Sequence, residues 1–138
     1  MNTPNNWNQA IINEFRANAG KVGGNFAGST ILLLHTTGAK SGQERINPVV
    51  CLAEGDRYII FASKAGAPTH PDWYHNLVTN SLVTVEFGAE KFQAQAAVAA
   101  EPERSALFKQ ITAVNPGFGE YQAKTTRVIP VIILTRMR

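Results

Sequence analysis

The fold is decided by the stretch Ile31-Leu32-Leu33-Leu34-His35-Thr36-Thr37-Gly38-Ala39-Lys40-Ser41-Gly42-Gln43-Glu44-Arg45. Its apolar start predicts a strand, and the alternating segment that begins at Ile46 predicts a second one. Between them, Gly38 and Gly42 permit positive φ angles and a close approach of the backbone to a ligand. Successive N–H groups in such a turn can bind an anion. With the cations Lys40 and Arg45, the loop is either an anion-binding hairpin or a plain solvated turn, and its residues alone leave both open.

Outward from this hairpin, apolar and alternating runs predict six strands, at residues 31–36, 46–53, 57–62, 83–87, 91–98 and 128–135. Pro48 marks an edge or a bulge in the second strand. Short turns connect the strands, so neighbours are expected to run antiparallel and to close into a small barrel. The expected fold class is α+β: a six-stranded, mainly antiparallel β-barrel with flanking helices. It forms one domain over residues 1–138, of which 1–6 are frayed.

Three helices are predicted, at residues 7–18, 72–80 and 101–114. The third has Ala106, Leu107, Ile111 and Val114 as its expected apolar side, and the sequence Asn-Pro-Gly-Phe-Gly at 115–119 breaks it. Two prolines and a glycine in residues 63–71 predict that this segment holds no regular structure.

The first predicted helix carries an apolar stripe that suits core packing, a lid or a membrane surface. Its polar face has a single cation, Arg16, so core packing or a lid is favoured. Membrane association is therefore expected to be at most peripheral, through residues 7–18.

Charge and cysteine content narrow the classes of function. The net charge of +3 fits a small anionic ligand and is too low to indicate nucleic-acid binding. The single cysteine, Cys51, excludes an internal disulfide and reads as a small buried hydrophobe. No signal-peptide pattern and no apolar run of 18 residues occur, so a cytoplasmic location is expected.

A second motif follows the third strand: Ala62-Ser63-Lys64-Ala65-Gly66-Ala67-Pro68-Thr69-His70-Pro71-Asp72-Trp73-Tyr74. Its small residues allow a flat ring to lie on the backbone, whose N–H groups can bond ring heteroatoms. The alternative is a long connector with Trp73 in the core, which leaves the run of small residues unexplained.

Other kinds of site find no support. His70 and His75 are five residues apart, His35 is remote, and no carboxylate completes a metal-ligand spacing. No Gly-x-Ser-x-Gly motif occurs, and Cys51 has no evident partner. The chemistry is therefore expected to come from a cofactor, with no metal.

Several segments together resemble the deazaflavin-dependent nitroreductase family, actinobacterial-type proteins that use reduced coenzyme F420. The segments are 32–48, 55–58, 62–77 and Tyr121-Gln122-Ala123-Lys124-Thr125-Thr126-Arg127-Val128-Ile129-Pro130-Val131. The resemblance implies a split β-barrel and F420 as hydride donor. It assigns the cofactor's phosphate and acidic tail to Lys40, Ser41, Gly42 and Arg45, with Asn47, Pro48 and Val49 following. It places the deazaflavin ring against Ser63, Lys64, Ala65 and Gly66, with Trp73, Tyr74 and Asn76 completing the pocket.

The implied reaction is hydride transfer to an electron-poor small molecule, a quinone, an enone or a nitro compound. Ser63 or Tyr121 would orient or protonate the acceptor, or Tyr121 would only form a pocket wall. Some relatives have a cation where this chain has Ala39, and a tyrosine cluster where it has Asn115, Phe118 and Tyr121. A quinone or another enone-like acceptor is therefore expected at least as much as a nitroimidazole. An FMN-dependent split-barrel reductase and a non-catalytic F420 carrier stay open, as do a monomer and a homodimer.

Overall fold

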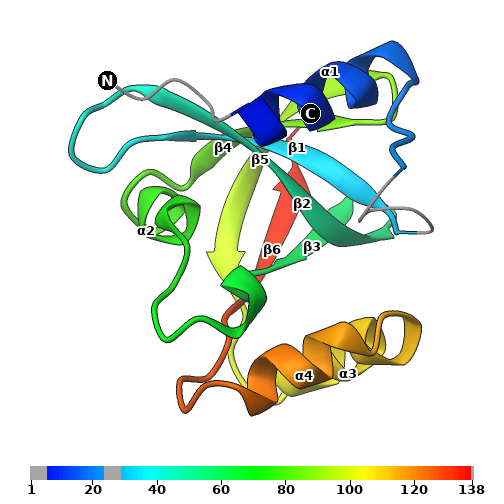
Figure 1. The fold of residues 1–138 in the computed structure, drawn as a ribbon. Coiled ribbons are helices and arrows are strands. Elements are labelled where there is room, and N and C mark those ends of the chain that lie inside the picture. The colour runs from blue at the N-terminus through cyan, green and yellow to red at the C-terminus, as the bar shows by residue number, and fades with distance from the viewer. Residues whose placement is uncertain (1–5, 24–28, 138) are drawn as a thin grey trace.

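The computed structural model describes residues 6–23 and 29–137, except for the side chains of Asn6, Trp7 and Ala65. Six strands form one closed barrel in the order β1-β2-β3-β6-β5-β4, with β4 pairing back to β1 (Figure 1). All six pairings are antiparallel, which confirms the predicted α+β barrel. The strands are β1 Ile31–Thr37, β2 Glu44–Glu54, β3 Arg57–Phe61, β4 Leu82–Phe87, β5 Glu90–Val98 and β6 Val131–Arg136. Of the segment predicted to be frayed, residues 1–5 lie outside the described part.

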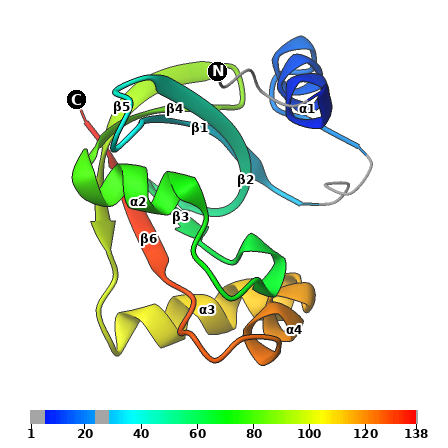
Figure 2. The ribbon, with the colours of Figure 1, turned by 60° about the vertical axis from the view of Figure 1, so that its left-hand side comes forward.

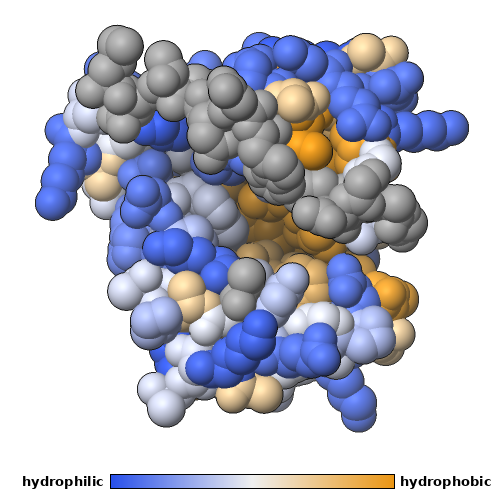
Figure 3. Space-filling model, in the orientation of Figure 1, coloured by the Kyte–Doolittle hydropathy of each residue, from blue (hydrophilic) through white to orange (hydrophobic). Residues whose placement is uncertain are grey.

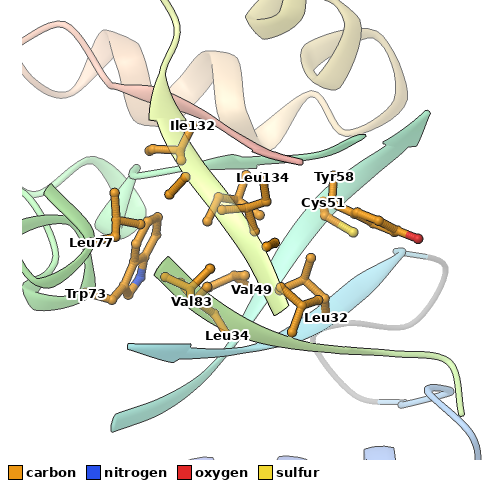
Figure 4. Close-up of a cluster of buried hydrophobic side chains, with 14 of the residues drawn as sticks. Leu32, Leu34, Val49, Cys51, Tyr58, Trp73, Leu77, Val83, Ile132 and Leu134 are labelled. Carbon is orange, nitrogen blue, oxygen red and sulfur yellow. The ribbon is translucent and has the colours of Figure 1, made fainter. Parts of the chain in front are cut away.

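Strand β1 is apolar throughout its first half because it is buried on both faces. Leu32 and Leu34 point into the barrel interior (Figure 4). Leu33 packs on the outside of the barrel against Ile12 and Phe15 of helix α1 (Asn6–Ala17). Alternate side chains of a strand point to opposite faces, so a continuous apolar run is what this position requires. The apolar stripe of α1 is occupied by core packing at Ile12 and Phe15.

Pro48 lies at an edge, as its residue type predicted. The Cys51 N–H donates to the Thr30 carbonyl at 2.9 Å. Because backbone N–H groups alternate in direction along a strand, the backbone nitrogen of Pro48 points away from β1. On that side β2 pairs with β3 only from Cys51 onward. The missing N–H of Pro48 therefore removes no ladder bond.

Helix α2 (Asp72–Thr79) lies across one end of the barrel (Figure 2). Its Trp73 and Leu77 side chains join the interior cluster formed by residues of the strands (Figure 4). Pro71 precedes the helix and Asp72 occupies its first turn, where a negative charge is favoured.

Helices α3 (Glu103–Val114) and α4 (Gly117–Ala123) pack on the outer face of β3 and β6. The third predicted helix exists, and its predicted apolar side is half right. Leu107 and Ile111 are buried as predicted, but Ala106 and Val114 are exposed, and Phe108 is buried in their place. The sequence missed α4 altogether. Asn115 does end α3, but Pro116 then serves as the N-cap of a new helix that begins at Gly117.

Candidate functional site

A cleft of about 800 Å³ lies beside β2, between α2 and α4. The face seen in Figure 3 is hollowed here, with hydrophobic residues along part of the wall. The predicted site residues that line it are Arg45, Asn47, Pro48, Val49, Ser63, Lys64, Trp73, Asn76 and Tyr121. The lining also includes residues that the sequence did not assign to the site: Ser29, Val50, Phe61, Pro71, Asp72, Asn115 and Phe118. The cleft thus brings together segments from most of the chain.

Five other predicted site residues, Lys40, Ser41, Gly42, Gly66 and Tyr74, are not among the lining residues, and the side chain of Ala65 lies outside the described part. Tyr74 instead packs against His70, with ring centroids 4.6 Å apart. Lys40, Ser41 and Gly42 form the exposed tip of the loop between β1 and β2, next to the cleft residue Arg45.

The β1–β2 loop has a defined backbone. The Gly38 N–H donates to the Gln43 carbonyl at 2.7 Å, and the Gly42 N–H donates to the Gly38 carbonyl at 3.0 Å. Gly42 has φ +71°, and a Cβ at Gly38 would lie 2.5 Å from the Ser41 hydroxyl oxygen. Both glycines are therefore needed for this turn. The loop is an ordered hairpin end and not a loose connector.

Two cations at this hairpin are available to an anion: Lys40 in the loop, and Arg45, which was predicted in the loop but lies in β2. Lys40 is exposed and pairs with no other residue in the described part of the chain. Arg45 donates only to neutral oxygens, to Gln43 Oε1 at 3.1 Å and to Ser41 Oγ at 3.5 Å. Neutral acceptors leave the guanidinium charge uncompensated, so it can still pair with a phosphate or a carboxylate.

Asn76 fastens the loop to helix α2. Its Oδ1 accepts the Ala39 N–H at 2.9 Å, and its Nδ2 donates to the Thr36 hydroxyl at 3.3 Å. Asn76 and Thr36 are both buried. Buried polar groups that bond each other fix the relative position of their elements. Asn76 therefore fixes the position of the β1–β2 loop relative to α2 and the cleft.

Ser63 and Lys64 form a turn with unpaired donors at the cleft. Residues 64–66, predicted to hold no regular structure, form a single 3₁₀ turn, η2 (Lys64–Gly66). Ser63 has φ −77° and Lys64 has φ +47°, the right-handed and left-handed pair that turns successive N–H groups into a nest for an anion. The N–H groups of Ser63 and Lys64 and the Ser63 hydroxyl bond to none of the described residues. These donors are free to bind a ligand.

Arg127 holds this turn from behind. It donates to the carbonyls of Ala62, Ser63 and Ala67 at 3.0, 2.7 and 2.9 Å, and contacts His70 Nδ1 at 2.8 Å. Burial, followed by the positive charges of Arg127 and His75, lowers the pKa of His70. A neutral His70 can accept the Arg127 bond. Sequence reasoning gave Arg127 no role, because its acceptors are about 60 residues earlier in the chain.

Aromatic side chains form the apolar wall of the cleft. The rings of Phe61 and Phe118 are 5.5 Å apart, and those of Phe118 and Tyr121 are also 5.5 Å apart. Tyr121 is partly exposed, and its hydroxyl bonds to none of the described residues. An apolar surface with a few free donors is typical of sites for flat organic ligands.

An ionic cluster on the outside of the barrel fixes α1 and stands apart from the cleft. Arg16 donates to both Glu86 oxygens, at 3.0 and 2.7 Å, and His35 Nε2 lies 2.6 Å from Glu86 Oε2. The Arg16 hydrogen bonds, opposed by burial and aided by His35, lower the pKa of Glu86 to about 2. His35 Nδ1 is 3.2 Å from Glu44 Oε2 but not in hydrogen-bonding geometry.

Cys51 packs in the barrel interior, where burial raises the pKa of its thiol to about 12. A thiol that stays protonated is a poor nucleophile, which agrees with the structural role expected for it. Within residues 6–23 and 29–137, no group of three or more His, Cys, Asp and Glu residues is placed to hold a metal ion. In the same ranges, no helix has the length and apolar content to cross a membrane.

Comparison with known proteins identifies the family. A family profile described as F420H(2)-dependent quinone reductase matches residues 7–136. An F420H(2)-dependent quinone reductase of Mycobacterium tuberculosis strain H37Rv is 38% identical over 126 residues, 88% of this chain and 85% of the relative.

Two solved structures share the fold. One, described as the F420-H2 dependent reductase FDR-A, has a TM-score of 0.69 and 40% identity, over 75% of this chain and 92% of that one. Another, described as a domain-swapped dimer, has a TM-score of 0.72 and 35% identity, over 96% of this chain and 99% of that one. The resemblance expected from the sequence is confirmed, and the chain belongs to the F420H(2)-dependent quinone reductase family.

Proposed function

We propose that this protein is an F420H2-dependent reductase that transfers a hydride to a quinone or a similar electron-poor acceptor. One observation carries the proposal: a single cleft brings Arg45, at the start of β2 beside the β1–β2 loop, together with the unpaired N–H groups of Ser63 and Lys64. A ligand with an anionic tail and a flat polar-edged ring fits that arrangement.

The described residues suit F420, which has a phosphodiester, an acidic tail and a flat ring. Lys40, Ser41, Gly42 and Arg45 would hold the tail, beside Asn47, Pro48 and Val49. Ser63, Lys64, Ala65 and Gly66 would carry the ring, with Trp73, Tyr74 and Asn76 around it. Tyr74 lies outside the lining and packs against His70, so it would support the pocket without touching the ring. When bound, the reduced cofactor supplies the hydride.

The protein itself would contribute to the reaction by positioning the acceptor and by giving it a hydrogen bond or a proton. The hydroxyls of Ser63 and Tyr121 are free within the described structure, and both residues line the cleft. Either could orient an acceptor oxygen or give it a proton, and such help accelerates reactions by about 10²–10⁴-fold. The apolar side of the cleft, at Val50, Phe61 and Phe118, favours a flat apolar acceptor such as a quinone.

The proposal is tested by titrating the purified protein with F420 and, in parallel, with FMN, followed by turnover of F420H2 with menadione. We expect F420 binding at micromolar concentration and consumption of F420H2. Binding of FMN in preference to F420 would instead support an FMN-dependent reductase. F420 binding without turnover on a panel of quinones, enones and nitro compounds would identify a carrier.

The two candidate proton donors can be separated by paired variants. Tyr121→Phe and Ser63→Ala each remove one hydroxyl, and whichever acts in catalysis should lower kcat by about 10²-fold. If both variants keep the kcat of the parent, neither hydroxyl takes part and Tyr121 is only a wall.

We further propose one domain, a cytoplasmic location and membrane contact that is at most peripheral, through residues 7–18. The packing of Ile12 and Phe15 against the barrel supports the last point, because it withdraws that stripe from lipid. A monomer and a homodimer are both compatible with the closed barrel. Light scattering on the purified protein distinguishes them. The measurement is of interest because one solved structure similar to this chain is described as a domain-swapped dimer.

A further inference from the structure

Arg127 lies between α4 and β6, and its guanidinium donates hydrogen bonds to the segment 62–67, about 60 residues earlier in the chain. The Nη1, Nη2 and Nε groups donate to the carbonyls of Ala62, Ser63 and Ala67, so one side chain spans the turn from its start to its end. The planar fork of a guanidinium can satisfy several acceptors at once, which an ammonium cannot do in the same geometry.

Two of those carbonyls belong to the peptide groups whose N–H groups are free. The Ala62 carbonyl and the Ser63 N–H share one peptide group, and the Ser63 carbonyl and the Lys64 N–H share the next. A hydrogen bond accepted at the carbonyl polarises the peptide group and makes its N–H a stronger donor. The effect is larger when the bond comes from a cation.

Apart from Arg127, the turn is held by its own hydrogen bonds and by the packing of Gly66 against the backbone at Tyr121. Lys64 has φ +47°, a backbone conformation disfavoured for a residue with a side chain. Within the turn, the Gly66 N–H bonds the Ser63 carbonyl at 2.9 Å and the Ala67 N–H bonds the Lys64 carbonyl at 3.0 Å. A strained turn of this kind persists when its surroundings fix it. Arg127 supplies the fixation at the Ala62 and Ser63 carbonyls, on the side away from the free donors.

We propose that Arg127 is a positioning residue that holds and polarises the Ser63 and Lys64 N–H groups toward a carbonyl oxygen of a flat electron-poor ring. The inference rests on the proposed function, in which that ring belongs to the cofactor or to the acceptor. Donors fixed in advance where negative charge develops lower the barrier without reorganisation.

The first test needs no cofactor. Hydrogen exchange is measured in the unliganded protein for the parent, Arg127→Met, Arg127→Lys and Arg104→Met. Arg104 is the matched control. Its guanidinium donates to the Ile129 carbonyl at 3.0 and 2.8 Å and to Gln122 Oε1 at 2.9 Å, and it makes no hydrogen bond to the described residues of the turn. We expect exchange at the Gly66 and Ala67 amides to rise about 10-fold or more in Arg127→Met and less in Arg127→Lys. Arg104→Met should leave these amides unchanged.

The second test uses F420H2 and menadione. Arg127→Met should lower kcat by about 10-fold or more, while Arg104→Met stays within about twofold. A parallel rise in the Kd of F420 would assign the ring oxygen to the cofactor, and a fall in kcat alone would assign it to the acceptor. Either result supports the positioning role.

The proposal is overturned if Arg127→Met keeps the exchange rates and kcat of the parent. It is also overturned if Arg104→Met impairs both as strongly, or if Arg127→Lys restores both fully, since charge alone would then suffice. Absence of F420 binding in the parent protein would refute the proposed function, while hydrogen exchange would still decide whether Arg127 holds the turn.

Discussion

Replacing Glu86 by Gln should destabilise the protein at neutral pH and remove part of its sensitivity to acid. Glu86 lies under α1, where it accepts two hydrogen bonds from Arg16 and contacts the buried His35. Its pKa is lowered from 4.5 to about 2, chiefly by the Arg16 hydrogen bonds. A carboxylate whose pKa is depressed by folding stabilises the folded state above its unfolded pKa. That contribution is lost as the pH falls from about 4.5 through about 2.

The difference between the two pKa values corresponds to an upper limit of about 3 kcal/mol by linkage. The Arg16 side chain is 45% exposed, so solvent screens the pair. Screening reduces the expected loss in Glu86→Gln to about 1–2 kcal/mol at pH 7. In thermal unfolding this corresponds to a fall in Tm of about 3–8 °C for a chain of this size.

The assay is urea unfolding of the parent and of Glu86→Gln from pH 7 to pH 2.5. Glu90→Gln serves as control, because Glu90 pairs with Arg136 on the surface and is 63% exposed. We expect the control to lose about 0.5 kcal/mol or less. The free-energy gap between the parent and Glu86→Gln should narrow as the pH falls below about 4.5. A gap that stays constant over the whole range would show that Glu86 is not a stabilising carboxylate, and would refute the reasoning.

Three further predictions concern the cleft. The double variant Lys40→Ala/Arg45→Ala should raise the Kd of F420 by about 10-fold at low salt and flatten its salt dependence in calorimetry; an unchanged salt dependence would remove the loop from the site. Asn76→Ala, which breaks the bonds between α2 and the loop, should cost about 1–3 kcal/mol in urea unfolding and weaken F420 binding; parent-like stability would contradict that role. Gly66→Ala should lower Tm and kcat together, because φ is +81° and the new Cβ would lie 2.8 Å from the Tyr121 carbonyl oxygen; normal values for both would contradict the close packing.

The sequence predicted the elements well where a single periodicity governs them. Among the described residues, the six strands and three of the four α-helices follow from alternation, apolar runs and 3.6-residue spacing. Helix α4 was not predicted, because Pro116 and Gly117 are typical of a helix break. In the structure the helix is held by Phe118, which is buried against Phe61. That burial depends on a contact between residues 57 apart in sequence, which no local pattern reports.

The candidate site was predicted as motifs but not as an assembled cleft. The motifs pointed to Arg45 and Ser63, because glycines, cations and small residues mark ligand-binding loops, whereas Asn76 was assigned only through the family resemblance. Phe61 and Val50 look like ordinary strand residues, and only closure of the barrel brings them to the cleft. No local sequence pattern marks Arg127 either, since its proposed role depends on hydrogen bonds to carbonyls that are distant in the sequence, such as that of Ser63.

The two walls of the cleft differ in how they are attached, so under the proposed function we expect cofactor binding and acceptor choice to respond to different substitutions. The β1–β2 loop is tied to α2 through Asn76. The turn at Ser63 is tied to α4, since Gly66 packs directly on the backbone at Tyr121. Changes in the loop should therefore alter F420 affinity while leaving the ranking of acceptors intact. Changes that displace α4 move the turn and the aromatic wall together, and so should change acceptor preference and hydride transfer at the same time.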